Sequence, residues 1–169
     1  VEAIAFYSEF SDKTENCSDS SNCSNGDASG SYVTGESLIS GLELQVGTVA
    51  TAGVFSIPVD ATLTLTKARH TQDSSDLKVL SGYKVKDVSE SVASLRVGLE
   101  HASGWNNYVV AKYTSELCSV AGCNRSGSDF DETEALVVVD FISRYQLKED
   151  VEVFLKTENI LDQQRIVSR

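Results

Sequence analysis

The chain has 169 residues, one proline, no methionine and a formal net charge of -11 at pH 7. This acidic balance, without a cluster of Lys and Arg, argues against nucleic-acid binding, because phosphate contacts need a basic surface. The abundance of Ser, Thr and Val favours strands with polar connections over a helical bundle. The longest apolar run, residues 135–139, is too short for a membrane helix.

Seven segments alternate between two kinds of residue with the period of two that is typical of strands. The first begins at once, without a signal peptide, so we expect the start to be mature or cut from something longer. In the last segment, three apolar residues alternate with Glu152, Phe154 and Lys156. In chain order the segments are residues 2–10, 32–46, 57–71, 88–101, 105–117, 132–147 and a last one that begins at residue 151.

The connections between these segments alternate between long and short. Long polar connections cover about residues 11–31, 72–87 and 118–131, and short ones lie near residues 48–56, 102–104 and 148–150. Strands that run up and down therefore place every long connection at one end. The sequence predicts an all-β fold, an antiparallel up-and-down meander of about seven long strands.

The length and chemistry of the segments favour a transmembrane β-barrel. Segments of about 10 to 16 residues exceed the usual strand length of about 5 to 6. Charged residues in mid-strand, such as Asp60, Arg96 and Asp140, suit the wet interior of a barrel. Aromatic residues near the segment ends, including Trp105 and Tyr145, suit the borders of a lipid-facing band. A soluble β-sandwich is the alternative, although its strands are shorter and its loops less one-sided.

The four cysteines form two local pairs, Cys17 with Cys23 and Cys118 with Cys123, inside the long polar connections. Zinc is the competing interpretation, but neither spacing is Cys-x-x-Cys, and the two histidines lie on separate segments. Two short-range disulfides are therefore predicted. They place the cysteines in an oxidising compartment such as the periplasm, the cell surface or the extracellular space.

Three stretches resemble parts of a known family. A strand that begins with Val139-Asp140-Phe141 and runs through Leu147 leads, by a short turn, to a strand from Val151 that ends in Glu158-Asn159-Ile160-Leu161-Asp162. This order resembles the closing strands of TonB-dependent outer-membrane receptors. Gly41-Leu42-Glu43-Leu44 is similar to a Gly-hydrophobic-Glu strand signature of the same family. Within this resemblance, Glu158 and Asn159 are interpreted as the end of a strand, where Asn and Asp satisfy turn backbone, and not as an active site.

The resemblance implies a fold and a function. Residues 1–169 would form a C-terminal portion of a larger transmembrane β-barrel of about 22 strands, without the plug domain and the final strand. The family takes up scarce nutrients, ferric chelates (siderophores) above all, across the outer membrane of Gram-negative bacteria. Its energy comes from a TonB-type coupling protein through the plug. The implied partners are thus a ferric chelate, the coupling protein and outer-membrane lipid.

Several basic residues in or near the long connections are candidates to attract an anionic chelate. We expect no enzyme and no cofactor, because no nucleophile elbow, phosphate loop or zinc-protease motif occurs. Acidic residues in the same connections make a calcium site conceivable, but they lack the twelve-residue ligand pattern. The alternative functions are a secreted or surface β-sandwich that binds through disulfide-pinned loops, and a small membrane barrel with a structural or adhesive role. The basic candidates are Lys78, Lys84, Lys86, Arg96 and Arg125.

Overall fold

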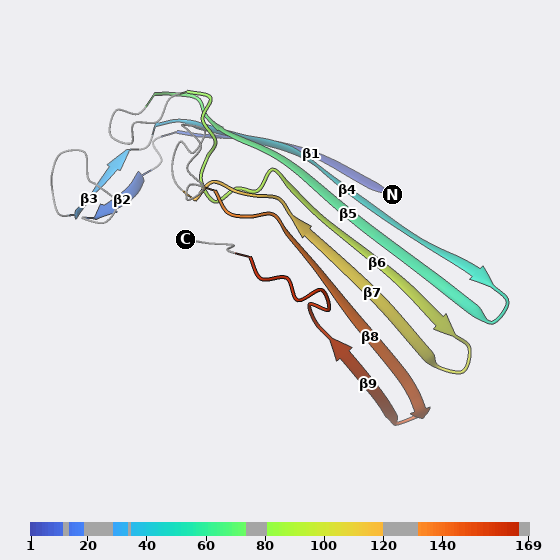
Figure 1. Cartoon of the computed structure of the whole chain (residues 1–169). Coiled ribbons are helices and arrows are strands. Elements are labelled where there is room, and N and C mark those ends of the chain that lie inside the picture. Colours follow the sequence, from blue (N-terminus) through green and yellow to red (C-terminus); the bar gives the residue numbers. More distant parts are fainter. Residues whose placement is uncertain (12–13, 19–28, 34, 74–80, 120–131, 166–169) are drawn as a thin grey trace.

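A computed structural model describes residues 1–11, 14–18, 29–33, 35–73, 81–119 and 132–165 of the chain. These residues form nine β-strands and no helix, and hence no helix with the length and apolarity to cross a membrane. Seven strands form one antiparallel sheet in the order β1-β4-β5-β6-β7-β8-β9 (Figure 1). They are β1 (Glu2–Phe10), β4 (Ser37–Ala52), β5 (Phe55–His70), β6 (Ser91–His101), β7 (Trp105–Thr114), β8 (Leu136–Lys148) and β9 (Val151–Thr157).

The predicted meander of seven long strands is confirmed, and the structure corrects its details. A separate hairpin of β2 (Thr14–Ser18) and β3 (Ser29–Val33) lies between β1 and β4, where the sequence predicted loop as far as about residue 31. The second predicted segment was wrong at both ends, because β4 begins at Ser37 and continues to Ala52. Small residues after Gly47 suggested a connection, but they pair with β5 over their whole length. Pairing with a neighbouring strand overrides their weak local preference.

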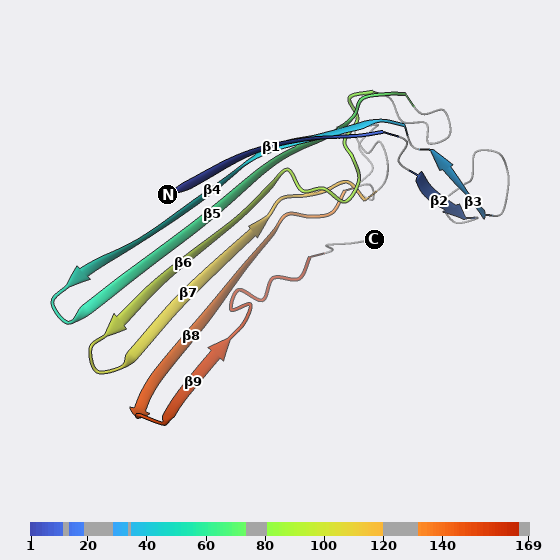
Figure 2. The ribbon, with the colours of Figure 1, turned by 180° about the vertical axis from the view of Figure 1, so that it is seen from behind.

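The predicted alternation of long and short connections is also confirmed. Residues 53–54, 102–104 and 149–150 join strands at one end of the sheet, which we call the short-turn end. Gly53 and Gly104 have positive φ values of 61° and 85°, a conformation that tight turns often require and glycine adopts at little cost. Residues 11–36, 71–90 and 115–135 join strands at the opposite, long-loop end, and β2 and β3 lie beyond it (Figures 1 and 2).

The strand register divides the sheet into two different faces, because directly paired residues of antiparallel strands share a face. Val59, Val97, Val109 and Phe141 lie side by side across four strands and define one row of the apolar face. The next two rows toward the long-loop end contain Ala61, Leu95, Ala111, Val139, Leu63, Ala93, Tyr113 and Val137. The row on the other side contains Leu99, Asn107 and Ser143. The opposite, polar face carries Glu43, Asp60, Arg96, Glu100, Lys112, Asp140, Arg144, Glu152 and Lys156.

The apolar face has no cover in the part of the chain that the structure describes. Leu95, Val97 and Val109 are 45%, 38% and 44% exposed although they lie in the middle of the sheet. The described residues form no second sheet opposite these rows, so a two-layer sandwich is not the architecture of this region. The sheet is open, with β1 and β9 as its edges, and closure into a barrel is not observed.

Apart from Pro58 in β5, the deeply buried apolar side chains of the described residues lie at the long-loop end. They are Ala68 at the end of β5, Val85, and Cys118. Backbone hydrogen bonds connect the segments that carry them, from the Val85 amide to the Ala68 carbonyl (3.2 Å) and from the Asp87 amide to the Cys118 carbonyl (2.8 Å). Parts of two long connections are therefore packed against β5 and against each other.

Candidate functional site

Asp140 connects two of the stretches that carry the family resemblance. It lies in β8 and is only 7% exposed. Its Oδ1 accepts a hydrogen bond from the backbone amide of Asn159 (2.9 Å), and its Oδ2 lies 3.4 Å from Nζ of Lys112. A carboxylate with so little water around it needs such partners to stay ionised. Asp140 thereby anchors the turn that follows β9.

Asn159 organises that turn. Its φ of 50° is a left-handed conformation, which asparagine tolerates better than most residues. Its Nδ2 donates to the Gln163 carbonyl (3.1 Å), and its Oδ1 accepts from the Gln163 amide (3.0 Å). The next amide, of Ile160, donates to the Val139 carbonyl (2.8 Å). These contacts agree with a structural turn and not with an active site.

The other residues of this motif have lesser contacts. Glu158 accepts a hydrogen bond from Lys156 (2.6 Å). Leu161 is 51% exposed. Asp162 has a φ of 47° and its amide donates to the Asn159 carbonyl (2.9 Å), which closes the turn. The sequence pattern identified this motif but not its hydrogen bond to Asp140. Asp140 and the motif are far apart along the chain and come together only when β8 pairs with β9.

Gly41, in the second predicted motif, allows the edge strand β1 to pack across β4. A Cβ atom at Gly41 would lie 2.4 Å from Cζ of Phe6 and 2.3 Å from the backbone oxygen of Leu65. No side chain fits there, so the phenyl ring occupies the space over the glycine. Leu42 belongs to the apolar face and Glu43 to the polar face, as alternation requires.

Replacing Gly41 by alanine should therefore loosen β1. We expect a loss of about 1–3 kcal/mol in unfolding free energy, because overpacking forces a shift of backbone. Gly47→Ala is the control on the same strand, since its Cβ would meet only Oδ1 of Asp60, at 3.1 Å. Urea unfolding of the two variants in detergent measures the difference. Equal stability of both variants would contradict this role of Gly41.

Arg96 lies on the polar face, where its charge is already compensated. Its Nε and one terminal nitrogen donate to Oδ2 of Asp60 at 2.9 and 2.7 Å. Its Cζ lies 5.5 Å from the ring centre of Tyr108, whose hydroxyl donates to Glu100 (2.6 Å). Arg96 is therefore part of a compensated charge network within the sheet.

Lys84 and Lys86 lie together in the second long connection, between β5 and β6. Lys84 Nζ is 3.4 Å from one oxygen of Glu90, and a terminal nitrogen of Arg69 is 2.7 Å from the other. The hydrogen bond from Arg69, together with the charge of Lys84, holds the pKa of Glu90 below its usual value, against the effect of partial burial. Glu90 thus stays ionised and keeps both cations in place. The remaining candidates, Lys78 and Arg125, lie outside the described residues.

The predicted disulfides stay predictions as pairs. Cys118 is 1% exposed and disulfide-bonded, but its predicted partner Cys123 lies outside the described residues. Cys17 is in β2, and Cys23 lies outside the described residues. The backbone around Cys118 is held independently, by an antiparallel bridge to Glu132.

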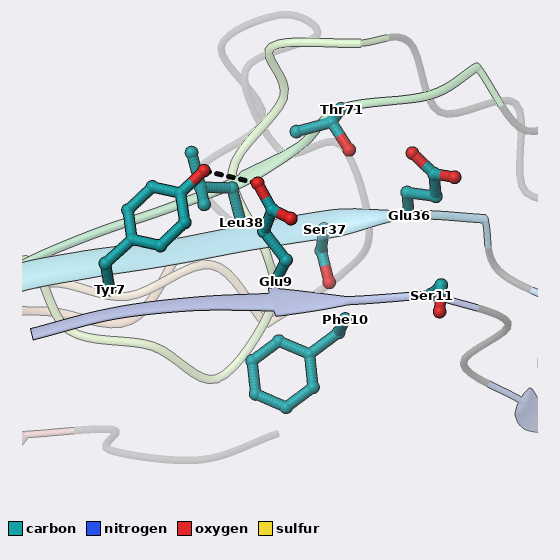
Figure 3. Close-up of a pocket in the computed structure, with 8 residues that line it drawn as sticks. All are labelled: Tyr7, Glu9, Phe10, Ser11, Glu36, Ser37, Leu38 and Thr71. Carbon is teal, nitrogen blue, oxygen red and sulfur yellow. Dashed lines mark hydrogen bonds between the residues drawn. The ribbon is translucent and has the colours of Figure 1, made fainter.

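A cleft of about 440 Å³ lies at the open edge of β1, near the long-loop end (Figure 3). Tyr7 and Glu9 project from one side of β1, where the Tyr7 hydroxyl donates to the Glu9 carboxylate, and Phe10 projects from the other. Glu36 also lines the cleft. With the carboxylates of Glu9 and Glu36 in its lining, the cleft does not suit an anionic ligand. The part of the chain that the structure describes contains no group of three or more His, Cys, Asp or Glu placed to hold a metal ion.

Comparison with known proteins does not assign this chain to a family. Neither a scan against protein-family models nor a search of curated proteins finds a match for this chain. What the chain does must therefore be argued from the two faces of its sheet, the anchored turn after β9 and the long connections.

Proposed function

We propose that this chain forms part of the wall and external loops of a TonB-dependent receptor in the outer membrane of a Gram-negative bacterium. In this proposal the seven strands belong to a larger β-barrel, and further strands pair with β1 and β9. The receptor takes up a scarce nutrient, in the first place a ferric chelate, with energy from a TonB-type coupling protein that acts through a plug domain.

The observation that carries the proposal is an apolar face without charge. From Leu65 to Phe55 on β5, and at the same levels of the other strands that the structure describes, this face has no Asp, Glu, Lys or Arg. The ten residue-to-residue steps from Phe55 to Leu65 extend about 33 Å along a strand. A tilt of about 40° reduces this to about 25 Å, the height of the lipid-facing band of outer-membrane barrels.

Aromatic residues border this band. At the short-turn end, register places Phe55 opposite His101, His101 opposite Trp105, and Trp105 opposite Tyr145. Trp105 is 53% exposed, and its indole nitrogen donates to the Ser143 hydroxyl (3.1 Å). An exposed ring with a satisfied polar group suits the boundary between lipid and water. On β7, Tyr113 has the corresponding place toward the long-loop end.

The polar face and the long loops also support a place in the wall of a large outer-membrane barrel. Ion pairs of Asp60 with Arg96 and of Lys112 with Asp140 suit the wet interior of a large barrel. The long-loop end corresponds to the extracellular side, because outer-membrane barrels have short periplasmic turns and long external loops. Lys84 and Lys86 lie at this end and would contribute to the attraction of an anionic chelate.

Behaviour in detergent tests the membrane placement. Expressed alone and kept without detergent, the chain should aggregate or pair through its open edges and apolar face, and detergent should keep it dispersed. A soluble monomer that unfolds cooperatively in plain buffer would overturn the proposal and favour a soluble binding module.

Growth under iron limitation tests the transported nutrient. Deletion of the gene should abolish growth on at least one ferric chelate as the iron source. Unchanged growth on a broad panel of ferric chelates would count against iron uptake.

A further inference from the structure

Cations cluster on the apolar face at the long-loop end of the described strands. On β5 the alternation that places Leu63 and Leu65 on this face continues to Lys67 and Arg69. Lys84 joins them, because it forms an antiparallel bridge with Arg69. At the opposite end of the same face the described strands carry aromatic residues, and one lysine, Lys148, which pairs with Val151 at the turn between β8 and β9. The cations thus lie immediately beyond one border of the apolar band.

Lys67 and Arg69 line a hollow of about 390 Å³, together with Ser40, Ser81 and Gly82. Lys84 lies beside it, paired with Arg69. Lys67 is exposed and forms no ion pair with the residues that the structure describes. Arg69 and Lys84 share the single carboxylate of Glu90.

Three cations therefore lie beside the single carboxylate of Glu90 here, in a chain whose net charge is -11. Glu9 lies in the same row as Arg69 by register, but two strands away on β1. The carboxylates of Glu9 and Glu36 line the neighbouring cleft at β1 and not this hollow. The hollow consequently combines a local positive excess with immediate access to the apolar rows of the sheet.

We propose that Lys67, Arg69 and Lys84 bind the phosphate of an anionic membrane-lipid headgroup. The inference rests on the proposed function, because it requires the apolar face to lie in lipid. The acyl chains would then lie along Leu65 and Leu63, and the phosphate at the level of Lys67. Lysine reaches a phosphate with a flexible stem, and arginine offers it several donors in a fixed geometry.

Lipid retention by the full chain in detergent micelles tests this inference. Native mass spectrometry would compare phosphatidic acid, which carries a phosphate monoester, with phosphatidylcholine of the same acyl chains. We expect the chain to retain phosphatidic acid preferentially. Lys67→Gln should weaken this retention about fivefold, since one basic residue near an anionic membrane surface contributes about that factor. Lys156→Gln is the matched control, because it removes the same charge from the polar face.

The possible outcomes separate the two proposals. Equal retention of both lipids, or no effect of Lys67→Gln, would overturn the headgroup site and leave the membrane placement intact. Displacement of phosphatidic acid by millimolar inorganic phosphate would show a general anion site, which also overturns the lipid assignment. A chain that is soluble without detergent and retains neither lipid would overturn the proposed function itself.

Discussion

Replacing Val109 by arginine should remove most of the protein from the outer membrane, whereas the same replacement at Val110 should be tolerated. The two valines are adjacent on β7 but lie on opposite faces. Val109 pairs with Val97 and Phe141 in the middle of the apolar face, and Val110 lies between Arg96 and Asp140. An arginine on the lipid face near the bilayer midplane costs about 2–4 kcal/mol, while positions that face the lumen accept charge.

The amount of folded protein in the outer-membrane fraction measures this difference. Two variants with identical chemistry control for the propensity of arginine in a strand and for its effect on synthesis. We expect Val110→Arg to stay near the level of the unsubstituted protein. Comparable losses at both positions would mean that the two faces of β7 have similar surroundings, and the membrane placement of the sheet would then be wrong.

Asp140→Ala should give the second large effect, the release of the turn that follows β9. It removes the acceptor of the Asn159 amide and the partner of Lys112 at a position that is 7% exposed. Hydrogen bonds to charged groups contribute about 1.5–3 kcal/mol, and a buried donor left unpaired costs a similar amount. We therefore expect a loss of about 2–3 kcal/mol in unfolding free energy.

Two further variants separate the contributions of Asp140. Asp140→Asn keeps an oxygen for the Asn159 amide and should cost less, about 1 kcal/mol. Lys112→Met removes a cation whose side chain is 61% exposed, so its loss should cost less than about 1 kcal/mol. Urea unfolding gives the three free energies, and hydrogen exchange at Asn159 and Ile160 reports the turn directly. Protection of these amides in Asp140→Ala equal to that of the unsubstituted protein would show that Asp140 is not the anchor.

The strands that the sequence predicted correctly are those with a clear local pattern, and the parts that it missed depend on pairing with other strands. Alternation at β5 and β9 is a local property, and so is the clustering of polar residues in long connections. Both were sufficient to predict the strands and the end at which the loops gather. The extension of β4 to Ala52 was missed because its small residues have weak preferences of their own and are held by hydrogen bonds to β5.

The face on which each side chain of β1 lies is also decided by pairing with another strand and not by local sequence. Ile4, Phe6 and Phe10 are the large apolar residues of β1, and their alternation alone says nothing about which way they point. Register with β4 places Phe6 opposite Gly41, on the face that also carries Glu43. The aromatic ring is accepted there because the glycine leaves space for it.

By itself, the sequence determined that this protein is built from long amphipathic strands in an up-and-down order. Only the tertiary structure decided that Asp140 meets Asn159, that Arg96 is compensated by Asp60, and that Lys84 pairs with Arg69. Each of these depends on the register between strands. Register is a long-range property, because a shift of one residue would exchange the two faces of a strand without changing its local pattern.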